Sequence, residues 1–168
     1  MERINSKRGN QRSRKSQAGF SLIELLVVVA VILVIAAVAI PNYIQSKMRS
    51  NEASAAQSLR NISTAEILYS TTYGINFSTN LLQLSGTGIN PDQNNAGLID
   101  EVLAAGSKSG YVINYTPLTT DTYGHTATYS VTADPQSSTT GQRHFYSDQT
   151  CVIRVNTTVQ AGPTDLPL

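Results

Sequence analysis

The sequence has little of the chemistry from which catalytic and metal sites are built. It contains one cysteine, Cys151, and two histidines, His125 and His144, among 168 residues. A lone cysteine excludes an intramolecular disulfide and any zinc site that needs several cysteines. Neither histidine forms a recognisable pair with a nucleophile, and no phosphate loop of the GxxxxGKS type occurs. We therefore predict no enzyme activity, no catalytic residues, no metal site and no cofactor.

Positive charge is also scarce outside the N-terminus. Six of the twelve lysines and arginines lie in residues 1–19 with a single acid, which leaves six basic and ten acidic side chains in residues 20–168. Beyond Gly74 only Lys108, Arg143 and Arg154 are basic. Nucleic-acid binding requires clustered lysines and arginines. No direct nucleic-acid partner is therefore expected.

The N-terminal region contains one long apolar run. Residues 25–40, LLVVVAVILVIAAVAI, are uninterrupted, and residues 20–24 extend the run to 21 positions broken only by Ser21 and Glu24. As a helix this stretch would be about 30 Å long, which matches the hydrocarbon core of a bilayer. The basic residues before it predict a cytoplasmic N-terminus and an outward C-terminus.

Two ordinary explanations compete for this run. One is a secretory signal peptide cut near Ala37-Val38-Ala39, a triplet of the A-x-A form, and the other is a plain signal anchor. Both leave Glu24 unexplained. A carboxylate inside a hydrophobic helix costs a few kcal/mol on insertion scales, so it usually has a partner or a function. A free α-amine created nearby would be such a partner.

The residues around Glu24 carry a resemblance. After the basic leader, Gly19-Phe20-Ser21-Leu22-Ile23-Glu24-Leu25 resembles the class III signal of type IV prepilins and type II secretion pseudopilins. That signal has a small residue, then a hydrophobic residue, then glutamate at the fifth mature position. In this chain these three positions are Gly19, Phe20 and Glu24. Pro41 also falls where many pilins place a helix proline.

The resemblance implies a processing step and an assembly contact. A prepilin peptidase would cleave between Gly19 and Phe20, and Phe20 would then be N-methylated. In the filament, the Phe20 ammonium and the Glu24 carboxylate of a neighbouring subunit would neutralise each other. Such a pairing is physically reasonable, because burying either charge alone in a low dielectric costs free energy and pairing the two charges offsets much of that cost.

The helical pattern continues beyond the apolar run. Pro41 removes one backbone donor and clashes with the carbonyl of Ala37, so a helix kink or local loosening is expected there. Past it, one apolar stripe runs to Tyr73, and Gly74 is the predicted C-terminal stop. The predicted stripe consists of Ile44, Met48, Ala55, Leu59, Ile62, Ala65, Tyr69 and Tyr73.

The C-terminal part predicts an antiparallel sheet. Residues 97–105 indicate a short helix with Leu98, Val102 and Leu103 inward, and residues 125–133 alternate cleanly between apolar and polar side chains. Further strands are predicted at 110–116, 143–147 and 150–155, and the tail is predicted to fray. Cys151 would lie buried as a small hydrophobe in the last of these strands; an intermolecular disulfide is the alternative.

These patterns predict an α+β fold, a long N-terminal helix packed on a three- to four-stranded antiparallel sheet, similar to the pilin fold. The predicted segments are a cleaved basic leader (1–19), a transmembrane or filament-core helix (20–41), its amphipathic continuation (42–73), an αβ loop with a short helix (74–109), and a sheet head with a C-terminal tail (110–168).

The resemblance implies a structural subunit that polymerises into a type IV pilus, used for motility, adhesion or DNA uptake. The implied partners are further copies of the chain, the inner membrane before assembly, the prepilin peptidase and methylase, and an assembly platform with its ATPase. The subunit would reside in the inner membrane and then in a surface filament. Two alternatives stay open: a type II secretion pseudopilin that drives protein export, and a membrane-anchored periplasmic binding module.

Overall fold

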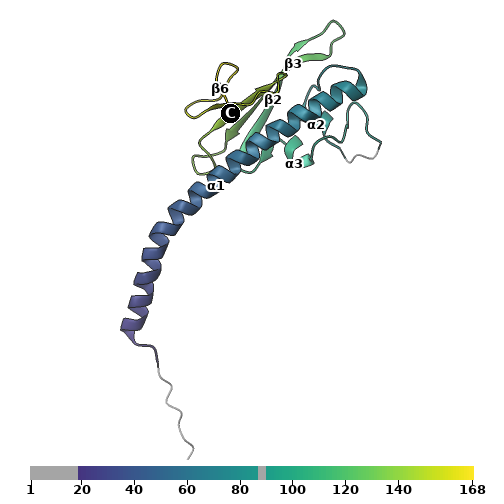
Figure 1. Cartoon of the computed structure of the whole chain (residues 1–168). Coiled ribbons are helices and arrows are strands. Elements are labelled where there is room, and N and C mark those ends of the chain that lie inside the picture. The colour runs from purple at the N-terminus through teal and green to yellow at the C-terminus, as the bar shows by residue number, and fades with distance from the viewer. Residues whose placement is uncertain (1–18, 87–89) are drawn as a thin grey trace, which may run out of the picture. The chain divides into compact units, whose positions relative to one another are not determined.

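The computed structural model describes residues 19–86 and 90–168 (Figure 1). The predicted leader, residues 1–19, lies outside the described residues except for Gly19. The chain divides after Ile40 into two compact units, and helix α1 (Leu22–Tyr73) contributes to both. Each unit is described by itself below.

The N-terminal unit consists of the first part of α1. The helix begins at Leu22, two residues later than the predicted start at Phe20. Residues 19–21 are not helical. It contains a stretch long and apolar enough to cross a membrane, and none of that stretch is buried. Leu, Ile and Val side chains are thus exposed all round this part of the helix. Such a surface needs a lipid or protein cover.

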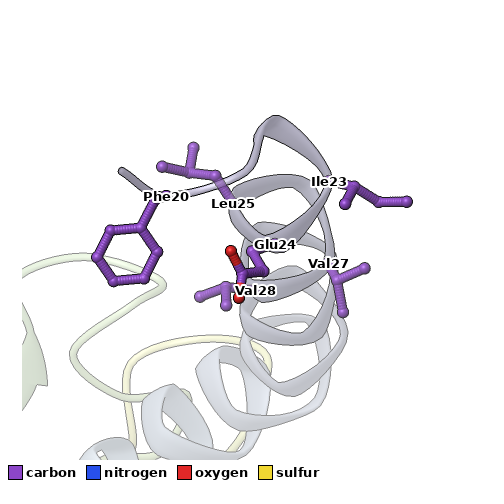
Figure 2. Close-up of a pocket in the computed structure, with 6 residues that line it drawn as sticks. All are labelled: Phe20, Ile23, Glu24, Leu25, Val27 and Val28. Atoms are coloured by element: carbon purple, nitrogen blue, oxygen red, sulfur yellow. The ribbon is translucent and has the colours of Figure 1, made fainter. Parts of the chain in front are cut away.

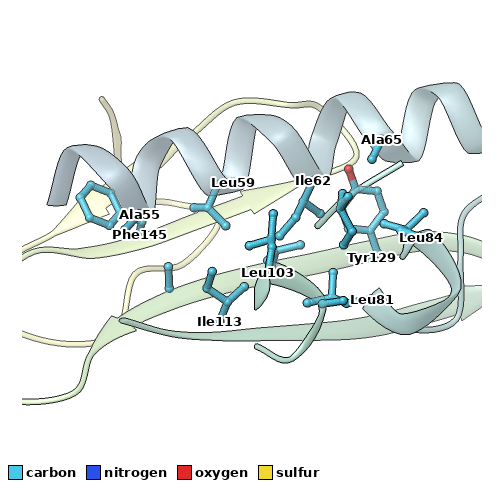
Figure 3. Close-up of a cluster of buried hydrophobic side chains, with 14 of the residues drawn as sticks. Ala55, Leu59, Ile62, Ala65, Leu81, Leu84, Leu103, Ile113, Tyr129 and Phe145 are labelled. Carbon is cyan, nitrogen blue, oxygen red and sulfur yellow. The ribbon is translucent and has the colours of Figure 1, made fainter. Parts of the chain in front are cut away.

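The second unit is a head in which the rest of α1 packs on a sheet (Figure 3). The helix ends at Tyr73, and Gly74 follows with a φ of +65°, a left-handed conformation that favours glycine and ends the helix as predicted. The centre of the predicted stripe is confirmed, whereas Ile44 is exposed and Tyr73 is only partly buried. The buried residues of α1 are Ala55, Ala56, Ser58, Leu59, Ile62, Ser63, Ala65, Glu66 and Tyr69.

The sheet confirms the α+β prediction. Within the described residues it has six antiparallel strands, and their spatial order equals their order in the chain. Three or four strands were expected. The two strands at the edges of the sheet have two residues each, which is too short for an alternating pattern to show in the sequence. The strands are β1 (Ser107–Lys108), β2 (Tyr111–Thr120), β3 (Thr126–Pro135), β4 (His144–Asp148), β5 (Arg154–Asn156) and β6 (Leu166–Pro167).

The loop between α1 and the sheet contains two short helices, α2 (Leu81–Leu84) and α3 (Glu101–Ala104). The sequence predicts the second of these but not the first, which begins where the Asn80 side chain accepts a hydrogen bond from the backbone N–H of Gln83. The predicted orientation of α3 is wrong at Val102, which is 58 % exposed, and right at Leu103, which is fully buried. One turn of helix is too short for its period to decide which face is inward.

The C-terminal tail is wrongly predicted to fray. Ala161 is buried, Leu166 and Pro167 pair with β5 as strand β6, and the backbone N–H of Leu168 donates to the carbonyl of Ile153 at 2.8 Å. Asp165 adds side-chain contacts, because its Oδ1 accepts from the Asn156 amide at 3.0 Å. These contacts join segments that are remote in sequence, so no local pattern reveals them.

Cys151 is not a buried strand residue, contrary to the prediction. It is exposed and has a φ of +60°, and its N–H donates to the carbonyl of Asp148 at 2.9 Å. The Asp148 carboxylate also accepts from the N–H and the hydroxyl of Thr150. Residues 148–151 therefore form a turn, and β5 begins only at Arg154.

The exposure of Cys151 gives a direct prediction. We expect Cys151→Ser to change the free energy of unfolding by less than about 0.5 kcal/mol, as at most surface positions. In the detergent-solubilised native chain, a maleimide reagent should modify the thiol as fast as it does in denaturant. Protection from the reagent in the native chain would contradict the exposed turn.

A buried glutamate joins α1 to the αβ loop. Glu66 is fully buried, and its carboxylate accepts hydrogen bonds from the N–H and the hydroxyl of Ser78 at 2.9 and 2.6 Å. The Tyr115 hydroxyl of β2 donates to the Ser78 carbonyl at 2.8 Å. Burial raises the pKa of Glu66 above its ordinary value, although the Ser78 hydrogen bonds oppose the rise. Nothing in the sequence marks this carboxylate as a core residue.

Candidate functional site

The predicted assembly residues lie at the start of α1, where Glu24 closes the first turn. The backbone N–H of Ser21 donates to Oε2 of Glu24 at 3.0 Å. This is half of a capping box, in which a glutamate at the third helical position reaches back to the N–H of the residue before the helix. The Ser-x-x-Glu pattern at residues 21–24 is the sequence signal from which this cap can be predicted.

The surroundings of Glu24 are apolar. Figure 2 shows Phe20 and Val28 on the same side of the helix as the Glu24 carboxylate, with Ile23 and Val27 on the other side. Apart from the Ser21 N–H, the described residues offer this carboxylate no hydrogen-bond donor or cation. In water the carboxylate is solvated, but under lipid or protein it would need a cation to offset the loss of hydration.

Gly19 and Phe20 precede the helix and are exposed, and neither lies in a helix or a strand. Phe20 is 89 % exposed, and a Cβ added at Gly19 would meet nothing within 4 Å. A peptidase can bind only a segment that is accessible and not fixed in a helix, and the 19–20 bond meets both conditions. Cleavage there and N-methylation of Phe20 stay predictions.

Pro41 lies inside α1, with helical residues on both sides. Its missing N–H leaves the carbonyl of Ala37 without its usual helical donor. The predicted kink at Pro41 stays a prediction.

The two histidines lie beside carboxylates at the sheet. Nδ1 of His144 is 2.6 Å from Oδ1 of Asp134, and Nδ1 of His125 is 3.3 Å from Oδ2 of Asp121. Both aspartates thus have neighbours that account for them structurally. Within residues 19–86 and 90–168, no group of three or more His, Cys, Asp or Glu side chains is placed to hold a metal ion.

Comparisons with known proteins identify a sequence motif and relatives of this chain. Residues 14–40 match the prokaryotic N-terminal methylation motif. The type IV major pilin protein PilA of Myxococcus xanthus is 46 % identical over 59 residues, which cover 35 % of this chain and 25 % of that protein. Two fimbrial proteins of Pseudomonas aeruginosa are each 35 % identical over 116 residues, covering 59 % of this chain and 75 % of theirs. An N-terminal methylation motif, a long helix on an antiparallel sheet and these relatives together place the chain in the type IV pilin family.

Proposed function

We propose that the chain is a structural, non-enzymatic subunit that polymerises into a type IV pilus on the cell surface. The observation that carries the proposal is the apolar helix at residues 22–40, none of which is buried, joined to a head that has its own core. A helix with this surface is stable in a bilayer and equally stable in a bundle of identical helices. Transfer from the membrane into a filament core therefore keeps its apolar surface away from water throughout.

In this proposal Glu24 fixes the axial position of each helix relative to its neighbours in the filament. Cleavage between Gly19 and Phe20 would create an ammonium at Phe20, and in the apolar filament core this cation would pair with Glu24 of a neighbouring subunit. Helix packing alone would tolerate sliding along such a smooth aliphatic surface. A buried ion pair penalises every register in which either charge is left alone.

Before assembly the prepilin would lie in the inner membrane, where a prepilin peptidase and methylase process it and an assembly platform with its ATPase extracts it. Motility, adhesion and DNA uptake are uses that such a filament would serve. The excess of acidic side chains in the head disfavours DNA binding along the shaft unless another protein supplies positive charge.

Intact-mass and N-terminal peptide analysis of filaments sheared from native cells tests the proposal. We expect an abundant chain that begins at N-methylated Phe20. A Phe20 terminus confined to the membrane fraction would indicate a pseudopilin instead. A retained leader, or a start at Ile40, would contradict the filament function altogether.

A further inference from the structure

Three arginines gather along one flank of α1 in the head. Arg49 and Arg60 lie on the helix and Arg143 comes from the loop before β4; together they line a groove of about 420 Å³. Its floor is small and apolar, with the exposed Ala53 and the buried Ala56 between the two helix arginines. The helix residues are spaced three and four apart, so they form one stripe beside the buried stripe.

Two of these arginines have no partner of their own. Arg143 is held by Glu52, whose Oε2 is 3.6 Å from the Arg143 Nε and whose Oε1 accepts from the N–H of Gln142. Arg49 and Arg60 form no ion pair or hydrogen bond from their guanidinium groups within residues 19–86 and 90–168. The groove therefore carries positive charge that this chain does not neutralise, although residues 20–168 are acidic overall.

The opposite flank of the head carries an unmatched acid. Glu101 is exposed at the start of α3, and among the described residues no cation or donor contacts its carboxylate. Its neighbour Asp100 is neutralised by Lys108 at 2.8 Å. A second groove on that flank is lined by Asn61, Thr64 and Leu68 of α1 together with Asp100.

The arginine groove and Glu101 lie at opposite edges of the sheet. α3 contacts β1, which is the first strand of the sheet, while Leu168, directly after β6, lines the arginine groove. Figure 1 shows α3 and β6 on opposite sides of α1. One molecule therefore cannot bring the two charges together, but two molecules side by side can.

We propose that the groove of Arg49, Arg60 and Arg143 binds the Glu101 carboxylate of a neighbouring copy of this chain, as a lateral contact between heads in the filament. Complementary surfaces at two different places on one molecule form a heterologous contact, which repeats without closing and so generates a helical polymer. The inference rests on the proposed filament function. The guanidinium groups suit the role, because their planar donors match a carboxylate in paired hydrogen bonds.

Charge exchange tests the contact. Arg60→Glu and Glu101→Arg each put like charges against each other, so we expect each to lower the yield of sheared filaments by roughly tenfold. Arg60→Glu combined with Glu101→Arg restores opposite charges and should return the yield to within about threefold of the unchanged chain. Melting temperatures and membrane levels should stay unchanged in all three variants, because both residues are exposed.

Lys47→Glu is the matched control. Lys47 is an exposed cation on the same helix that does not line the groove, so its reversal should leave the yield unchanged and should not rescue Glu101→Arg. Normal yield from either groove variant, or a double variant no better than the worse single one, overturns the contact. Normal yield with lost binding of dextran sulfate in Arg60→Glu filaments would also overturn it, and would assign the groove to an acidic polymer. If the unchanged chain formed no filaments, the proposed function itself would fail.

Discussion

Glu24→Ala should abolish filament formation while leaving membrane insertion and cleavage intact. In the proposed pairing, removing the carboxylate would leave the Phe20 ammonium of a neighbouring subunit without a counter-charge in an apolar filament core. An unpaired buried charge costs about 3–5 kcal/mol. Because that cost recurs at every subunit added, the yield of sheared filaments should fall to background. Insertion should improve slightly, because the apolar helix loses its one acidic side chain.

Glu24→Gln separates the charge from the helix cap. The glutamine side-chain carbonyl can still accept the Ser21 N–H, so the first turn of α1 keeps its capping hydrogen bond. If the charge is what matters, Glu24→Gln should be as deficient in filaments as Glu24→Ala. Full assembly by the glutamine variant would show that Glu24 acts as a cap only, and the proposed pairing with Phe20 would be discarded.

The assay must distinguish assembly from processing. Membrane and sheared fractions are compared by immunoblotting, and the mass of the membrane-bound chain reports whether the leader has been removed. Both Glu24 variants should accumulate as cleaved chains in the membrane. Accumulation of the uncleaved chain would instead assign Glu24 a role in recognition by the peptidase.

Much of the fold could be predicted because it depends on the local spacing of apolar residues along the sequence. The stripe through Leu59 and Ile62 has the helical period, and the alternation through Tyr129, Val131 and Ala133 has the strand period; all five side chains are buried in the structure. The helix stop at Gly74 is equally local, because it depends on one left-handed residue.

Other features depend on contacts between distant segments, and these could not be predicted. Strand β6 forms because it pairs with β5. Cys151 is exposed because the Asp148 side chain stabilises a turn at residues 148–151, where the apolar residues of the sequence predicted a strand. The arginine groove is a similar case. Arg49, Arg60 and Arg143 look like isolated charges in the sequence, and only the packing of α1 against the loop before β4 brings them together.

The same limit applies to Glu66, whose removal should have the largest effect on the stability of the head. Glu66→Ala leaves the N–H and the hydroxyl of Ser78 without their acceptor in a buried site. Each unsatisfied buried donor costs about 1–3 kcal/mol, so we expect a loss of about 3 kcal/mol in the free energy of unfolding. The exposed Glu101→Ala is the matched control and should change it by less than about 0.5 kcal/mol.

Glu66 should also make stability depend on pH in a predictable direction. Because burial raises its pKa in the folded state, the folded chain binds a proton more tightly than the unfolded chain. Its stabilising contribution is therefore complete below the ordinary pKa of 4.5 and is lost as the pH rises through the higher folded value. Asp100 acts in the opposite sense at lower pH, because its hydrogen bond from Lys108 lowers its pKa below 3.8.

Thermal melts of the mature, detergent-solubilised chain at a series of pH values test this assignment. Above pH 4.5 the unchanged chain should lose stability relative to Glu66→Gln as the pH rises, since glutamine has no proton to release. The neighbouring phenols of Tyr69 and Tyr115 should not contribute there, because burial raises the pKa of both above the ordinary value of 10.0. A difference in stability between the two chains that stays constant above pH 4.5 would show that the folded and the unfolded chain bind the Glu66 proton equally, and the raised pKa of Glu66 would then be wrong.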